Sequence, residues 1–359
     1  MKYLNEYRNP ELVSALVREI RRSSRREIAL MEVCGGHTMA IHRYGIPALL
    51  PENIRLLSGP GCPVCVSSRS FVDHAIALAQ MPGMTITTYG DLIRVPGTLS
   101  SLDEARASGC DVRIVGSTLE AIALARANPE RKVVFLGIGF ETTAPGSAAA
   151  AQMAMQQGIN NFSLLSAHKI MPPAMEALIT EGVRINGYIC PGHVSAITGA
   201  SIYDFIPEKY GLGCVIAGFE PTDILQSILM LVKQIEEGRP AVEIQYRRAV
   251  QQEGNLKAQA LLSEVFELCD DWWRGFGTIP ASGLRLKEQY KAFDAAALFK
   301  VSLPEPKEEK GCICGELLKG LKKPSDCKLF AKICTPENPV GACMVSNEGA
   351  CAAFYRYGR

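Results

Sequence analysis

The sequence has no long hydrophobic run and almost no net charge. No stretch of about 18 residues is both apolar and uncharged, which excludes an ordinary transmembrane helix. Because 38 Lys and Arg residues face 37 Asp and Glu residues, the formal charge is +1, and no general electrostatic field attracts nucleic acid or an anionic membrane. Charged residues also stand among the first six positions, where a signal peptide needs an apolar segment, so we expect a cytoplasmic protein.

Two common nucleotide-binding motifs are also missing. No G-x-x-x-x-G-K-[ST] sequence occurs, and the segment 137–143 resembles a dinucleotide fingerprint but has Thr142 at the position of the third glycine. We therefore predict no nucleotide site. Glu141 instead places a carboxylate at the end of a predicted strand, beside a helix start that Thr142 or Thr143 can cap. Helix capping alone and a role of Glu141 in a functional site both stay open.

Cysteine, in contrast, is abundant, with 13 residues. Because a cytosol keeps thiols reduced, we expect metal binding or redox chemistry rather than a structural disulfide framework. Cys110, Cys214 and Cys269 resemble small apolar residues in their runs and are interpreted as structural. Six others lie near the end of the sequence, at Cys312, Cys314, Cys327, Cys334, Cys343 and Cys351.

Short apolar runs, each bounded by glycine, proline or polar residues, predict strands that are buried on both faces. These runs are 28–33, 54–57, 84–89, 112–115, 133–138, 162–166, 185–190 and 214–217. Amphipathic segments predict helices at 10–22, 71–80, 119–127, 148–157, 174–180 and 224–236. The alternation predicts an α/β fold of about nine strands, which fits two parallel-sheet, Rossmann-like domains facing a cleft better than one wide sheet.

We place the domain boundary after the helix that ends at Asn128, which divides a first domain, 1–128, from a second, 129–302. The segment 303–310 is charged and contains proline, which predicts a linker. The whole region 303–359 is rich in cysteine, glycine and proline and has no sustained periodicity. Since such a segment cannot build much apolar core, we expect an inorganic centre to organise it.

Two cysteine motifs follow predicted strands, at the edge where open parallel sheets bind ligands. Cys34 opens the sequence C-G-G-H-T, in which the glycines permit a sharp turn and His37 lies three residues on. Cys62 and Cys65 form a C-x-x-C pair in the loop 59–65, where two prolines stiffen the chain and hold the thiols close. Such a pair is typical of a redox dithiol or of half a metal site, and the spacing does not decide between them.

Histidines follow two further predicted strands. His168 comes after the run 162–166, and His193 follows 185–190 in the sequence P-G-H-V-S. One such histidine is usually a hydrogen-bonding residue of the fold. Several strand ends that offer Cys, His and Glu together favour one shared cleft.

The six cysteines near the end of the sequence suit a metal centre of either of two kinds. Zinc and an iron–sulfur cluster both use four thiolates. Zinc sites usually contain two close C-x-x-C pairs, and this region has none. Its widely spaced cysteines therefore favour an iron–sulfur cluster, although spacing alone does not select the four ligands.

Taken together, these motifs resemble the HypD family of nickel–iron hydrogenase maturation factors. The resemblance extends from about Cys34 to Tyr355 and is carried by the segments 34–38, 59–65, 139–143, 191–195, 326–330, 334–336 and 343–346. The cluster pattern of this family, C-x14-C-x6-C-x16-C, implies a 4Fe–4S cluster on Cys312, Cys327, Cys334 and Cys351. It leaves Cys314 and Cys343 outside. Family members often carry a second histidine where this sequence has Met39, so that ligand is not carried over.

The resemblance also implies a function. The chain would be a scaffold and redox centre on which an iron atom receives two cyanides and one carbon monoxide, together with the chaperone HypC. Cyanide would come from HypE, and the chain alone would be monomeric. The iron would be held at Cys34, with Cys62 and Cys65 as further ligands or as a redox dithiol. His37, Glu141 and His193 complete the expected site residues.

Two other functions fit parts of the sequence. A cluster-dependent thiol–disulfide oxidoreductase would use Cys62 and Cys65 on a protein disulfide and would need neither Cys34 nor a chaperone. A zinc-stabilised binding protein would have no redox role. Colour separates the last from the others, because a cluster protein purified without oxygen is brown and a zinc protein is colourless.

Overall fold

The structure is a computed structural model that describes residues 6–307 and 309–358. The first five residues of the N-terminal segment considered above lie outside this range, as does residue 308 of the predicted linker. Residues 301–307 form no helix or strand, in agreement with a linker.

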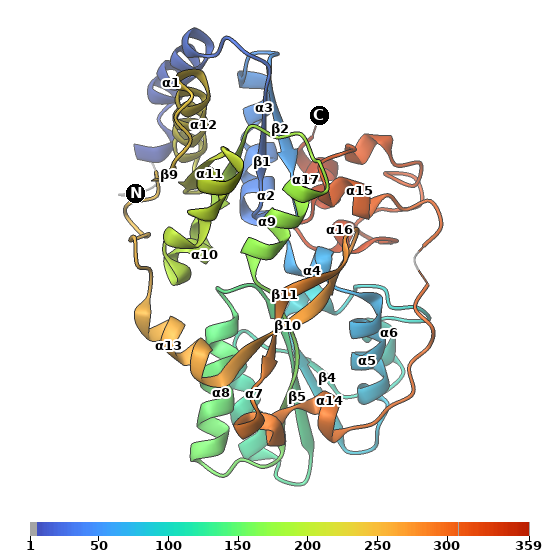
Figure 1. Cartoon of the computed structure of the whole chain (residues 1–359). Helices are drawn as coiled ribbons and strands as arrows, with labels where there is room; N and C mark the ends of the chain where they lie inside the picture. Colours follow the sequence, from blue (N-terminus) through green and yellow to red (C-terminus); the bar gives the residue numbers. More distant parts are fainter. Residues whose placement is uncertain (1–5, 308, 359) are drawn as a thin grey trace.

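Nine parallel strands form two separate sheets (Figure 1). The five-stranded sheet has the order β2-β1-β7-β8-β9 and the four-stranded sheet the order β4-β3-β5-β6. The strands of the first are β1 (Ile28–Glu32), β2 (Ile54–Ser58), β7 (Gly187–Pro191), β8 (Gly213–Ala217) and β9 (Val242–Ile244). Those of the second are β3 (Met84–Thr88), β4 (Val112–Ile114), β5 (Lys132–Gly139) and β6 (Phe162–His168). The predicted α/β class is confirmed, and each of the eight predicted runs forms a strand.

The predicted domain boundary at residue 128 is wrong. It falls between β4 and β5, which belong to the same four-stranded sheet, whereas β1 and β2 share the five-stranded sheet with β7, β8 and β9. The chain therefore leaves the first sheet after β2, builds the second sheet, and returns at β7. Alternating strands and helices look the same along the sequence whichever sheet a strand joins, so periodicity gives no sign of this crossing.

Helices cover the faces of both sheets. Early helices are α1 (Pro10–Ser23), α2 (Gly35–Arg43), α3 (Ile46–Leu49), α4 (Pro63–Val66), α5 (Arg69–Ala79), α6 (Leu102–Ala107), α7 (Thr118–Ala127) and α8 (Ala144–Gln156). Later helices are α9 (Met171–Thr180), α10 (Gly192–Thr198), α11 (Phe205–Tyr210), α12 (Pro221–Glu237), α13 (Leu256–Val265) and α14 (Ala295–Leu298). All six predicted helices are present. Within the described ranges, no helix has the length and hydrophobicity needed to cross a membrane.

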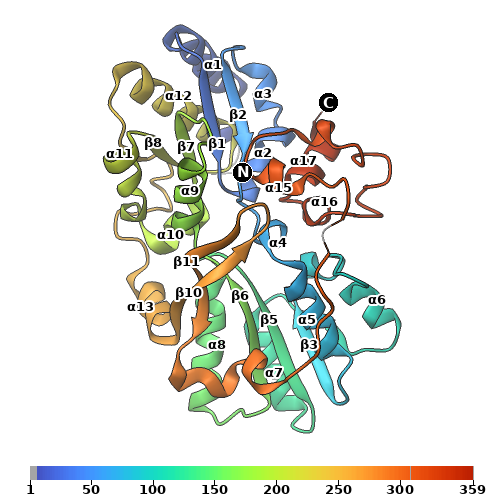
Figure 2. The ribbon, with the colours of Figure 1, turned by 45° about the vertical axis from the view of Figure 1, so that its right-hand side comes forward.

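A β-hairpin that the sequence analysis did not predict joins the two halves. It consists of β10 (Phe266–Trp273) and β11 (Gly277–Leu286), which pair antiparallel. The hairpin extends from the four-stranded sheet to the middle of the molecule, where its tip meets α4 (Figure 2). There Arg274 Nε donates to the Cys65 carbonyl oxygen at 3.0 Å, and its Nη2 donates to the Ser67 carbonyl oxygen at 2.9 Å. The tip thus holds the carbonyl end of α4.

The cysteine-rich segment after residue 310 packs on the helices that follow β1 and β2. It contains α15 (Cys314–Leu318), α16 (Ala342–Val345) and α17 (Ala350–Tyr357). Helix α17 packs against α2, and α16 packs against α4. Several of its residues, including Leu317, Met344 and Ala352, belong to the same buried core as the β-sheet residues Met31 and Ile138. This segment is therefore part of the main body of the protein.

Candidate functional site

The carboxyl ends of strands from both sheets border one cleft of about 340 Å³. Cys34 follows β1, His193 follows β7, and Thr142 follows β5. The loop after β3 contributes Asp91, and the cysteine-rich segment contributes Glu348. The cleft thus collects side chains from segments far apart in the sequence, as expected where parallel strands end together.

Cys34 lies partly exposed at the start of α2. Its backbone amide donates to a carboxylate oxygen of Glu32 at 3.0 Å, and the Thr38 hydroxyl donates to the other oxygen. Burial raises the pKa of Cys34 to about 12, with a further contribution from the carboxylate of Glu348, while the backbone amides of Gly36 and His37 act in the opposite direction. The thiol therefore keeps its proton at neutral pH until a cation stabilises the thiolate.

Among the described residues, the imidazole ring of His37 makes no hydrogen bond to the sulfur atom of Cys34. It is fully buried, and its Nε2 donates to the carbonyl oxygens of Ala217 (3.2 Å) and Gly218 (3.0 Å), at the end of β8. Burial lowers the pKa of His37 to about 4, so the ring is neutral. Its Nδ1 has no hydrogen-bond partner among the described residues. His37 contributes its backbone amide to the surroundings of Cys34, while its ring ties α2 to β8.

Phe219 connects His37 with the other predicted histidine of the cleft. Its ring stacks on that of His37 with 4.6 Å between centroids and on that of His193 with 4.0 Å. His193 is exposed on the cleft side of this stack. The sequence analysis missed Phe219, because an aromatic residue after a strand carries no chemical signal by itself.

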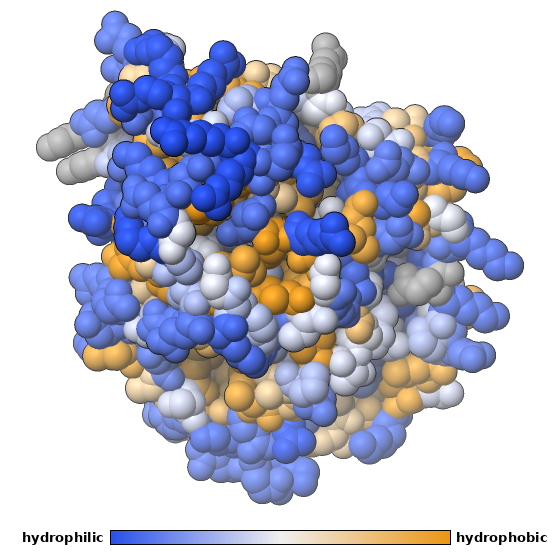
Figure 3. Space-filling view, turned by 45° about the horizontal axis from the view of Figure 1, so that its top comes forward, coloured by the Kyte–Doolittle hydropathy of each residue, from blue (hydrophilic) through white to orange (hydrophobic). Residues whose placement is uncertain are grey.

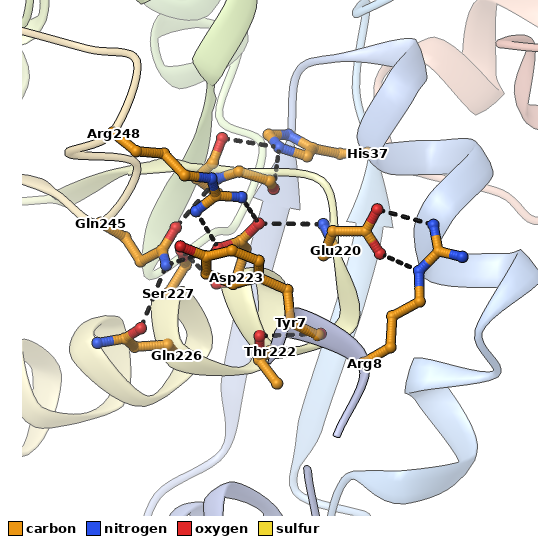
Figure 4. A network of polar contacts seen from close by, with 12 residues as sticks. Tyr7, Arg8, His37, Glu220, Thr222, Asp223, Gln226, Ser227, Gln245 and Arg248 are labelled. Atoms are coloured by element: carbon orange, nitrogen blue, oxygen red, sulfur yellow. Dashed lines mark hydrogen bonds and ion pairs between the residues drawn. The ribbon is translucent and has the colours of Figure 1, made fainter. Parts of the chain in front are cut away.

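A buried polar network holds the loop that carries Phe219 (Figure 4). Asp223 is fully buried; both its carboxylate oxygens accept from Arg248, and one also accepts from Gln245. The backbone amide of Glu220 donates to Asp223 at 3.2 Å, and the Glu220 carboxylate pairs with Arg8. These contacts fix the residues between β8 and α12, and with them the stack that borders the cleft.

Cys62 and Cys65 are joined in a disulfide, with 5.2 Å between their Cα atoms. Both are buried, at 3% and 0% exposure, so the cleft is lined by their neighbours Gly61 and Pro63 rather than by the sulfur atoms. A Cβ at Gly61 would lie 2.1 Å from the backbone nitrogen of Cys34. The loop can approach Cys34 this closely only because residue 61 is glycine.

Glu141 lies outside the cleft. One carboxylate oxygen accepts from the backbone amide of Met171 at the start of α9, at 2.9 Å, and the other has no partner among the described residues. Burial raises its pKa to about 7. Helix capping, one of the two roles left open for Glu141, is what the geometry supports, although the capped helix is α9 rather than the helix that directly follows.

All six cysteines near the end of the sequence line a second, small apolar cavity. Cys314 and Cys343 are joined in a disulfide, with 6.5 Å between their Cα atoms. The other four are free thiols, at Cys312, Cys327, Cys334 and Cys351. Burial raises the pKa of Cys351, and the three other free thiols, which line the same cavity, raise it further.

The four free thiols fit an iron–sulfur cluster by their chemistry. Cys312 shows the same pattern as Cys351, because burial and the neighbouring Cys327 and Cys334 all raise its pKa. Ionising several neighbouring thiols in an apolar cavity requires a cationic centre, and a cluster takes one thiolate for each iron. Across residues 6–307 and 309–358, no group of three or more His, Cys, Asp or Glu side chains is arranged to hold a single metal ion.

The two disulfides lie on neighbouring helices. Cys65 belongs to α4 and Cys343 to α16, and these helices pack against each other. Arg274 of the hairpin tip donates to the carbonyl end of α4 and opposes part of the rise in the pKa of Cys312. The Cys314–Cys343 disulfide therefore borders the cavity of free thiols, and its helix α16 packs on α4, whose residues Pro63 and Val64 line the cleft.

Glu348 is the residue of the cleft that the sequence analysis missed most plainly. A Cβ at Gly35 would lie 2.4 Å from the Cβ of Glu348, so the missing side chain of Gly35 makes room for it. Two residues earlier, Ser346 donates to the Asp91 carboxylate at 2.7 Å. These contacts bring a carboxylate from the end of the chain beside Cys34.

The comparisons with known proteins all point to hydrogenase maturation or formation proteins. The family model HypD, described as "Hydrogenase formation hypA family", matches residues 11–358. The hydrogenase maturation factor HypD2 of Bradyrhizobium diazoefficiens is 48% identical over 370 residues, covering 100% of this chain and 97% of that protein. HypD of Rhizobium leguminosarum bv. viciae is also 48% identical, over 100% of this chain and 96% of that protein. A putative hydrogenase expression/formation protein of Methanocaldococcus jannaschii is 49% identical over 93% of both chains. This chain belongs to the HypD family of hydrogenase maturation factors.

The buried carboxyl of Glu141 predicts a pH dependence of stability. Its pKa in the folded protein, about 7, lies above the ordinary value of about 4.3. The protonated form is therefore favoured by folding, and its contribution is complete below about pH 4 and is lost as the pH rises to about 7. Between about pH 5 and pH 8, we expect the unfolding free energy of the natural chain to fall by roughly 2–3 kcal/mol relative to Glu141→Gln.

Urea unfolding of both proteins at the two pH values measures this difference. Glu208→Gln, at an exposed position of α11, is the matched control and should follow the natural chain. Parallel pH profiles for the natural chain and Glu141→Gln would contradict the prediction.

Proposed function

We propose that this chain is the scaffold and redox centre on which the iron of a nickel–iron hydrogenase receives two cyanides and one carbon monoxide. A chaperone of the HypC type and a cyanide donor of the HypE type would be its partners. The observation that carries the proposal is the arrangement of thiols. A free thiol, Cys34, stands in the cleft; the disulfide-bearing loop touches its backbone; and a second disulfide connects that loop with a cavity of four free thiols.

The iron would enter as cargo and bind Cys34. A thiolate is a soft ligand that suits iron carrying cyanide and carbon monoxide. The positive charge of the iron would reverse the effect of burial on the Cys34 pKa, so that metal binding releases the thiol proton. The amides of Gly36 and His37 then face the negatively charged sulfur. His193, exposed after the neighbouring strand β7, is available to donate a hydrogen bond to a cyanide nitrogen.

Delivery of cyanide from a thiocyanate requires electrons. The carbon–sulfur bond breaks, the sulfur leaves as a thiolate, and cyanide keeps the electron pair that binds iron, so two electrons are consumed. Reduced Cys62 and Cys65 can supply both, releasing two protons as they close to the disulfide seen here. The Gly61–Cys34 contact keeps this pair next to the iron site.

The second disulfide would restore the first. A thiolate of reduced Cys314 or Cys343 attacks the Cys62–Cys65 disulfide and, through a mixed disulfide, passes on two electrons. The packing of α4 on α16 supports this exchange. When bound by Cys312, Cys327, Cys334 and Cys351, a 4Fe–4S cluster supplies electrons one at a time.

The two other functions have less support. A general thiol–disulfide oxidoreductase must present its dithiol to a protein disulfide, but Cys62 and Cys65 are buried behind Gly61 and Pro63. A zinc-stabilised binding protein does not account for two disulfides on the neighbouring helices α4 and α16, which pack against each other.

Alanine substitutions test the ligands of the cluster. Replacing any one of Cys312, Cys327, Cys334 and Cys351 should remove most of the visible absorption of the protein purified without oxygen, because one iron loses its thiolate and the cluster is no longer held. The region after residue 310 should also become more sensitive to protease, since the metal centre organises it. Cys314→Ala and Cys343→Ala are the matched controls and should keep the colour. Loss of colour in the controls alone would show that the ligand assignment is wrong.

Thiol trapping with mass spectrometry tests the order in which electrons reach the two disulfides. After reduction of the cluster, the natural chain should show free thiols at Cys62 and Cys65. The double variant Cys314→Ser/Cys343→Ser should keep its colour but leave Cys62 and Cys65 oxidised, because the intermediate carrier is missing. A small dithiol should still reduce them in this variant. Equal reduction in both proteins would exclude the proposed relay.

The infrared spectrum tests the central proposal. Cys34→Ala should abolish the bands of iron-bound cyanide and carbon monoxide, while its stability changes by less than about 1 kcal/mol because a partly exposed thiol contributes little packing. Cys34→Ser should be nearly as damaging, since a hydroxyl is a hard and mostly protonated ligand. Cys269→Ala, away from the cleft, is the control. If the bands persist in Cys34→Ala, the iron ligands would have to be reassigned to Cys62 and Cys65.

A further inference from the structure

Positive charge is concentrated around the thiols of the proposed cluster. Between residues 319 and 332 the sequence contains five lysines and one aspartate, a net charge of +4, whereas the whole chain carries only +1. Lys319 pairs with Glu181, which leaves four exposed lysines. These are Lys322, Lys323, Lys328 and Lys332, here called the lysine surface. Among the described residues, none of the four forms an ion pair with an acidic side chain.

Two members of the lysine surface lie directly on the segment that carries two of the thiols, Cys327 and Cys334. Phe330 N donates to Cys327 O at 3.1 Å, and Cys334 N donates to Leu329 O at 2.9 Å, so the segment from Cys327 to Cys334 forms a compact loop. Lys328 and Lys332 project from this loop, and Ile333 between the thiols is 58% exposed. Cys327 is only partly buried, in contrast to Cys334. This loop is therefore where the thiol cavity comes close to solvent.

Apolar surface accompanies the charge. Lys322 and Lys323 border a groove of about 560 Å³ between β2 and the cysteine-rich segment, with Leu56, Leu321 and Phe354 also in its wall. Leu321 is 57% exposed. Figure 3 shows the same character on its right-hand side, where hydrophilic side chains project between hydrophobic patches. An apolar centre within a charged rim is the usual composition of a protein-binding surface.

We propose that the lysine surface is the docking site of a small acidic one-electron carrier protein, which reduces the cluster. This rests on the proposed function, since that function consumes two electrons for each cyanide and the chain contains no source of them. Each docking event would oxidise the carrier and reduce the cluster by one electron. Two such events, with two protons from solvent, would open the Cys314–Cys343 disulfide. Charge complementarity selects an acidic partner and speeds its association.

Binding and reduction by a plant-type ferredoxin, an acidic iron–sulfur carrier, test the proposal. The variants Lys322→Glu/Lys323→Glu and Lys328→Glu/Lys332→Glu should each bind it about tenfold more weakly at low salt and lose the salt dependence of association. Their visible absorption and their photoreduction by a neutral deazaflavin should stay unchanged. Lys233→Glu/Lys257→Glu, with the same charge change on exposed lysines of α12 and α13, should behave as the natural chain.

Three results would overturn the proposal. The first is equal binding by all variants, and the second is equal loss of binding in the control pair. The third is equally tight, lysine-dependent binding to anionic lipid vesicles or to RNA, which would make the lysine surface a general anion site. Iron content and colour, measured on the same samples, distinguish a failure of the proposed function from a failure of the docking site. A colourless natural chain refutes the cluster, whereas a coloured chain that does not bind the carrier refutes only the docking site.

Discussion

The cleft depends on one backbone contact, between Gly61 and Cys34. The Gly35 amide donates to Gly61 O at 2.9 Å, and a Cβ at residue 61 would lie 2.1 Å from Cys34 N, so the loops touch with no side chain between them. Both loops start at the same sheet edge because β1 and β2 are neighbouring parallel strands. The contact sets Cys34 beside the loop that carries the Cys62–Cys65 disulfide. Any side chain at residue 61 would separate the two.

Burial gives this small site its electrostatic character. Glu32, whose carboxylate accepts from the Cys34 amide, is 2% exposed, and burial raises its pKa to about 8. The Cys34 thiol experiences the same desolvation and the charge of Glu348 as well. A low-dielectric site that holds acidic groups and lacks a paired cation favours their neutral forms. It also favours the arrival of a cation, because that cation removes the cost of ionising every acid around it. This electrostatic character supports the proposed uptake of iron.

The local parts of this structure could be predicted from the sequence, and the long-range parts could not. Runs such as 28–33 and 133–138 form strands because burial on both faces requires continuous apolar residues, which is a local property. The assignment of β5 to the sheet of β3, and of β7 to that of β1, depends on where the chain crosses over, which leaves no periodic trace. The sequence analysis did not identify Arg274 for the same reason, because its contact with α4 depends on where an unpredicted hairpin ends. The motif residues Cys34 and His193 do line the cleft, but Glu141 and the ring of His37 turn away from it.

The cysteine-rich segment links the thiol cavity to the cleft that would receive iron in the proposed function. Between Cys343 and Cys351, the same short stretch of chain carries Ser346, which bonds Asp91, and Glu348, which faces Cys34. A metal centre that orders the segment around Cys351 therefore also sets the position of a carboxylate in the cleft. In the proposed function, loss of that centre would remove one wall of the cleft together with the source of electrons. Because one segment would carry both functions, a chain without the proposed cluster would present an incomplete site to iron, and iron binding would follow cluster binding.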